Sequence, residues 1–161
     1  LNAKCFIMPY VDVKPGDVYW EAIQKIGATG ILKGIGKSEG WANKTYFYPD
    51  STIALDEFTA AINNFIPCLP VYDTTIMRPL QIKEAWDVLV KLQHVIRQKK
   101  NIPHAWPPIL KNEQKKVWEQ FSLGKYPGDN IVITRKQLAI LMNSLATNPF
   151  YTEIDFNGRV K

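Results

Sequence analysis

Apolar residues recur at the spacing of an α-helix in five stretches of the chain, each bounded by glycine, proline or short polar segments. This pattern predicts helices over residues 18–28, 53–65, 81–100, 112–123 and 134–145. The helix over residues 81–100 has the clearest pattern, because Trp86, Leu89 and Leu92 share one side while its lysines lie mostly on the other. The pattern therefore predicts an all-α fold with short extended segments near the two ends of the chain.

Glycine and proline set the limits of these helices. Four glycines between residues 27 and 36 supply the turn that stops the first helix, and a polar loop over residues 40–50 follows. Prolines end the second and third helices and place residues 104–106 in an irregular turn. Trp20, Trp86 and Trp118 lie on helical apolar stripes, so we expect them in the core.

One segment of the chain recurs. The stretch Phe47-Tyr-Pro-Asp-Ser-Thr-Ile-Ala-Leu-Asp-Glu-Phe58 returns loosely as Tyr126-Pro-Gly-Asp-Asn-Ile-Val-Ile-Thr-Arg-Lys-Gln-Leu138. Both copies are a loop, then an isoleucine, then a helix, with Phe58 and Leu138 equivalent and expected in the core. Ile53 and Ile133 are 80 residues apart, so either a third unit or a long insertion lies between them.

The motifs of the first copy resemble the S-layer homology family, a helix-loop-helix unit of cell-envelope proteins. Its opening aromatic-x-Asp-Val, its Glu-Ala-Ile, its Gly-Ile-x-x-Gly turn and its Phe-x-Pro-Asp-x-x-Ile approach to the second helix are all matched. The matching residues are Tyr10-Val-Asp-Val13, Glu21-Ala-Ile23, Gly30-Ile31 with Gly34, and Phe47, Pro49, Asp50 and Ile53. The family's Thr-Arg-Ala-Glu-Phe signature is reduced to Glu57-Phe58 in the first copy and is better kept in the second, as Thr134-Arg-Lys-Gln-Leu138.

The resemblance implies one domain of helix-loop-helix repeats with an enlarged middle section. We place the first repeat at residues 10–65, a connector and middle helix at 66–111, a second, divergent repeat at 112–146 and a tail at 147–161. Family members are non-catalytic modules that anchor proteins to cell-wall polysaccharide through basic and aromatic residues in grooves between motifs. The expected function is therefore binding of cell-wall or another anionic polysaccharide, in the cell envelope or outside the cell.

A second resemblance gives an alternative function. The stretch from Tyr10 to Gly34 is also similar to a region that follows the catalytic part of some secreted FAD-dependent oxidoreductases and carbohydrate-active enzymes. On this interpretation the chain, which starts with Leu1, is a C-terminal appendage that packs on its parent's catalytic domain and binds no glycan.

Composition and charge narrow the function classes. The chain has 161 residues, 46% of them hydrophobic, as in an ordinary globular protein, and no apolar run long enough to cross a membrane. The net charge is +5, and it comes from the second half of the chain. A basic half attracts any polyanion, but no nucleic-acid motif is present, so we expect no nucleic-acid partner. Cys5 and Cys68 have no metal-ligand spacing, and whether they pair is open.

No pattern indicates catalysis or a cofactor. The glycine-rich stretch 27–40 follows a helix and does not join a strand to a helix, as a phosphate-binding turn would. His94 and His104 are not spaced as a metal-ligand pair, and Asp56-Glu57 fits the start of a helix, where the helix dipole favours acidic residues. We therefore expect a protein that is not an enzyme and holds neither metal nor cofactor.

The candidate ligand-binding residues are basic or aromatic side chains in or beside the family-like loops. Aromatic rings and charged groups are common in sugar-binding grooves. These residues are Trp41, Trp106, Lys33, Lys44, Arg135 and Lys136. Arg135 and Lys136 follow Thr134 in the signature, so we expect both at the mouth of the groove, and we expect replacement of Arg135 to cost little stability. For each residue, plain surface solvation or core packing is the alternative.

Overall fold

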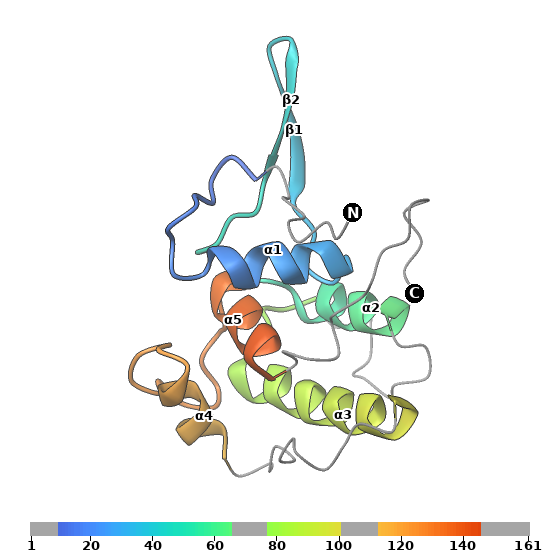
Figure 1. The fold of residues 1–161 in the computed structure, drawn as a ribbon, viewed down its shortest axis with the longest axis vertical. Coiled ribbons are helices and arrows are strands. Elements are labelled where there is room, and N and C mark those ends of the chain that lie inside the picture. The colour runs from blue at the N-terminus through green and yellow to red at the C-terminus, as the bar shows by residue number, and fades with distance from the viewer. Residues whose placement is uncertain (1–9, 66–76, 101–112, 146–161) are drawn as a thin grey trace.

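The structure is a computed structural model that describes residues 10–65, 77–100 and 113–145. Five helices and two strands follow one another in the order α1 (Trp20–Thr29), β1 (Ile35–Glu39), β2 (Ala42–Tyr46), α2 (Leu55–Phe65), α3 (Ile82–Lys100), α4 (Gln114–Gln120) and α5 (Arg135–Leu145) (Figure 1). All five expected helices are confirmed, and each begins one or two residues after its expected start. The tail, most of the connector and the turn at residues 104–106 lie outside the described residues.

The prediction of an all-α fold is wrong. The chain is a mixed α/β protein, with an antiparallel hairpin of β1 and β2 where a polar loop was expected. Ile35 pairs with Tyr46 and Glu39 pairs with Ala42, which leaves Gly40 and Trp41 as the two-residue turn. Gly40 has φ 62°, as the first central residue of a type II′ turn requires. The hairpin projects from the body of helices, at the opposite end of the molecule from α4 (Figure 1).

The base of the hairpin is fastened to the body by the segment that precedes α1. Val11 donates its backbone N–H to the carbonyl oxygen of Thr45 (3.0 Å), and the carboxylate of Asp12 accepts the backbone N–H groups of Phe47 (2.8 Å) and Tyr48 (2.6 Å). The buried Tyr10 ring lies so close to Gly34 that a Cβ there would come within 2.5 Å of it. The aromatic-x-Asp-Val motif, through Tyr10, and the glycine motif, through Gly34, are therefore packed against each other at the base of the hairpin.

Three segments that lead into helices α2, α3 and α5 are joined in a ring. The first residue of each helix donates its backbone N–H to the carbonyl oxygen four residues before the next of these helices begins. These bonds run from Leu55 to Arg78 (2.8 Å), from Ile82 to Ile131 (2.9 Å) and from Arg135 to Ser51 (2.9 Å). We call the segments unit 1 (residues 51–65), unit 2 (78–95) and unit 3 (131–145). The ring gives the domain approximate threefold symmetry.

Equivalent positions in the three units have equivalent burial. Two residues before each helix lies a fully buried aliphatic side chain, and another residue at the fourth helical position is also fully buried. These sets are Ile53, Leu80 and Ile133, and Phe58, Ala85 and Leu138. The expected burial of Phe58 and Leu138 is confirmed. The open choice between a third unit and an insertion is also resolved, because unit 2 supplies the third repeat.

The third helical residue closes the start of two of the helices. Gln137 accepts the backbone N–H of Thr134 (3.0 Å) and donates its own to the Thr134 hydroxyl (3.3 Å), which is a complete capping box. In unit 2 the Glu84 carboxylate accepts the backbone N–H of Gln81 (3.1 Å). Side chains of the third helical residue therefore fix the starts of α3 and α5, and the three units share one core.

The buried residues of the three units form a single cluster with Ile23 and Ile26 of α1 and with Trp118 of α4. Trp86 and Trp118 are buried, as expected, whereas Trp20 is only half-buried. Within the described residues, no helix has the length and apolar character needed to cross a membrane.

Candidate ligand-binding surface

Arg135 begins α5 in the interior of the domain. Its guanidinium donates to the backbone carbonyl oxygens of Phe47 (Nε, 2.8 Å) and Lys33, and its Nη1 lies 3.4 Å from the Glu57 carboxylate. The guanidinium carbon also lies 4.9 Å from the centre of the Phe47 ring. Arg135 is only 3% exposed. It joins unit 3 to the loop and helix of unit 1, so the free arginine expected at the mouth of a groove is not what the structure has.

Lys136 lies at the outer edge of the same junction. Its backbone N–H donates to the carbonyl oxygen of Pro49 (2.9 Å), and its ammonium pairs with the carboxylate of Asp50 and lies 5.5 Å from the centre of the Tyr19 ring. About a third of the lysine side chain and most of the Asp50 side chain are exposed. The junction of units 3 and 1 thus presents a cation, a carboxylate and an aromatic ring to solvent.

The hairpin carries a second group of basic and aromatic residues. Lys37 lies with its ammonium 5.7 Å from the centre of the Tyr46 ring and 5.2 Å from that of Tyr48, and the two rings are stacked with centroids 5.5 Å apart. Glu39 pairs with Lys44 (2.8 Å) and accepts a hydrogen bond from the Tyr46 hydroxyl. These five side chains form one connected surface along the hairpin.

Contacts within the hairpin favour the ionised forms of its lysines and of Glu39. Hydrogen bonding, first from Lys44 and then from Tyr46, lowers the pKa of Glu39, and the same contact with Glu39 raises the pKa of Lys44. The neighbouring Tyr48 side chain raises the pKa of Lys37. Two cations therefore face one anion on this surface at neutral pH.

The remaining expected ligand residues lie apart from one another. Trp41 stands at the tip of the hairpin and is 100% exposed, and Lys44 lies on β2 below it. Lys33 has an exposed side chain, while its carbonyl oxygen accepts a hydrogen bond from Arg135. Trp106 lies outside the described residues. The structure thus brings Lys136 and Arg135 to the unit junction and brings Trp41 and Lys44 to the hairpin.

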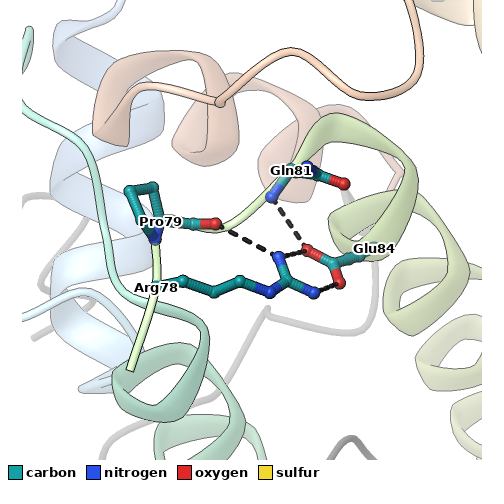
Figure 2. A network of polar contacts seen from close by, with 4 residues as sticks. All are labelled: Arg78, Pro79, Gln81 and Glu84. Carbon is teal, nitrogen blue, oxygen red and sulfur yellow. Dashed lines mark hydrogen bonds and ion pairs between the residues drawn. The ribbon is translucent and has the colours of Figure 1, made fainter. Parts of the chain in front are cut away.

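A further charged network lies at the start of α3 (Figure 2). Arg78 pairs bidentately with Glu84 through Nη1 (2.9 Å) and Nη2, and Glu84 is buried. Burial alone would raise the pKa of Glu84, but the bonds from Arg78 and from the Gln81 N–H together lower it. Since each oxygen of this carboxylate has a partner within the chain, the network serves the fold.

The junction and the hairpin bring together side chains of a few kinds. No group of three or more histidine, cysteine, aspartate or glutamate side chains within the described ranges is placed to hold a metal ion. The groups that gather at the junction and on the hairpin are lysines and partly exposed tyrosines, with one carboxylate at each place. Such a surface can pair with anionic groups and stack against flat, weakly polar ones.

Sequence reasoning missed four residues of this surface: Tyr19, Lys37, Tyr46 and Tyr48. Lys44, Tyr46 and Tyr48 stand at every second residue, and this period of two was the available signal for the two tyrosines. Searches against protein-family models, curated proteins and solved structures find no match to the chain.

Proposed function

We propose that this domain is a non-catalytic binding module for an anionic polysaccharide of the cell envelope. The observation that carries the proposal is Lys136, whose side chain is about one third exposed, beside the Tyr19 ring at the junction of units 3 and 1. A lysine beside an aromatic ring offers a charge for an acidic substituent and an apolar face for a sugar ring. The motif resemblance to the S-layer homology family supports the same ligand class.

Arg135 has a supporting part in this proposal. Its bonds to the carbonyl oxygens of Lys33 and Phe47 hold the segments before β1 and after β2 against the start of α5, where Lys136 follows directly. Arg135 is thus a positioning residue and does not contact the ligand. Asp50 has the opposite effect, because it competes with an anionic ligand for the Lys136 ammonium.

The test is co-sedimentation of the purified domain with cell-wall sacculi and with matched material stripped of its acidic polymer. We expect binding only to the first, weakened at high ionic strength by screening. Lys136→Ala should weaken binding about threefold to fivefold, the range of one exposed ion pair. Asp50→Asn should strengthen it, because the variant removes the competing carboxylate.

The matched control is Lys115→Ala, which removes an exposed lysine from α4 at the end of the molecule away from the hairpin (Figure 1). Equal losses for Lys115→Ala and Lys136→Ala would indicate attraction by net charge alone and contradict the site. No sedimentation of the parent at low salt would overturn the function and favour the enzyme-appendage alternative.

A further inference from the structure

The hairpin adds little to the stability of the domain. None of its ten strand residues is buried, and an isolated two-stranded ribbon is at best marginally stable in water. The segment that leads into unit 3, from the end of α4 at Gln120 to Ile131, contains no strand. A hairpin before the unit is therefore not required for the ring to form. The hairpin therefore needs an explanation other than packing.

Its residues are sorted between two faces. Because side chains alternate along a strand, the pairing places Lys37, Glu39, Lys44 and Tyr46 on one face, while the other has small or uncharged residues. Lys37 and Lys44 are directly paired across the strands. Like charges in that position repel each other, and this cost is offset by the pairing of Lys44 with Glu39 and by the two tyrosine rings beside Lys37. The charged side chains and Tyr46 are thus gathered on one face of the hairpin, where they contact one another.

Tyr48 adds a second cost at the same place. Its φ is 56°, in the left-handed region that bulky side chains rarely adopt. The equivalent residue of unit 3, seven positions before the helix, is Gly128, with φ 120°. Asp12 holds the backbone of Tyr48 in this turn, which places the Tyr48 ring on Tyr46 and against Lys37. A glycine would adopt this turn without strain. The contacts of the tyrosine ring, and not the turn itself, therefore explain a tyrosine at this position.

We infer that the face formed by Lys37, Lys44, Tyr46 and Tyr48 is a second contact site for an acidic polysaccharide chain, separate from the unit junction. The inference rests on the proposed function. The tyrosine rings offer flat faces for pyranose rings, and the two lysines give this face a net positive charge that complements acidic substituents. A bilayer fits less well, because the exposed apolar Ile35 and Trp41 lie at opposite ends of the hairpin, and the strand residues beside the tip include Glu39, Ser38 and Asn43.

The experiment measures binding of oligogalacturonate, a chain of acidic sugars, to the domain labelled with ¹⁵N. We expect shifts of backbone amide signals along residues 35–48 as well as near Tyr19 and Lys136. Tyr48→Gly should keep the fold, since glycine suits the turn, yet weaken binding about threefold or more. Lys37→Ala should weaken it by a similar factor. Polyglutamate, which has the charges without sugar rings, should be insensitive to Tyr48→Gly.

The matched control is Ser122→Gly, which relieves a second non-glycine residue with positive φ, 59°, in the part of the chain that the structure describes. It should leave binding unchanged. Shifts confined to Tyr19 and Lys136, with parental affinity in Tyr48→Gly, would overturn the hairpin site and leave the proposed function intact. Absence of binding by the parent would overturn both. Hairpin shifts with phosphatidylglycerol vesicles and none with oligogalacturonate would overturn the sugar site in favour of a lipid surface.

Discussion

Arg135 shows how one residue can change its role with its position. The equivalent residues of the other units, Leu55 and Ile82, are apolar and buried, and Arg135 is buried in the same way. Its charge is accommodated because two carbonyl oxygens and the Glu57 carboxylate surround the guanidinium. An arginine at an interior position of the ring can reach two loops at once, which leucine or isoleucine cannot do.

We therefore expect Arg135→Ala to lower the free energy of unfolding by about 2–4 kcal/mol, since it leaves buried carbonyl oxygens without donors and opens space beside Phe47. Arg135→Lys should recover only part of this loss, because lysine lacks the planar fork. Denaturant unfolding measures both. A midpoint equal to that of the parent for Arg135→Ala would contradict this prediction and agree instead with the small loss of stability expected from the sequence.

At the scale of the elements, the start of α3 depends on an ionised side chain. Glu84 accepts bonds from Arg78 and from the N–H of Gln81, and its pKa is lower than that of an ordinary glutamate. A carboxyl group with a lowered pKa in the folded state stabilises the fold fully above its ordinary, unfolded pKa. This contribution is lost as the pH falls through the folded value.

Glu84→Gln should therefore be less stable than the parent at neutral pH, and the difference should shrink as the pH falls below the ordinary pKa of glutamate. Thermal unfolding of both proteins across the acidic range measures this. Glu119→Gln, which changes an exposed glutamate on α4, is the control and should show no such convergence. A gap between Glu84→Gln and parent that is constant with pH would contradict the role of the charge.

The helices could be predicted from sequence and the hairpin could not, for a physical reason. Each helix buries a stripe of apolar residues, so the helical spacing of these residues can be recognised in the sequence, as for Phe58 and Ile62 of α2. The strands bury nothing, so Lys37, Ser38 and Glu39 show no apolar alternation. Trp41 and Lys44 could be recognised as binding candidates by residue type. The burial of Arg135 depends on loops far away in sequence, which no local pattern reveals.

At the scale of the whole molecule, the threefold ring makes a prediction about equivalence. Ile53, Leu80 and Ile133 occupy one position in the three units, and all are fully buried. Replacing any of them with alanine should cost about 2–5 kcal/mol, since each loses apolar burial and leaves a cavity. Ile131→Ala, at an exposed position two residues before Ile133, should cost far less. A small loss of stability for Leu80→Ala alone would show that unit 2 is not equivalent to the other two units of the ring.

The closure of the ring also has a consequence for folding kinetics. The ring is closed by the hydrogen bond from Arg135 in unit 3 to Ser51 in unit 1, and these two residues are 84 positions apart in the sequence. Contacts of such long range slow folding, because the entropy of closing the loop is lost before packing compensates for it. During synthesis, unit 1 leaves the ribosome long before unit 3 exists. Ile53 and Phe58 then lack their final neighbours, and this interval is when the nascent chain is most exposed to aggregation and to capture by chaperones.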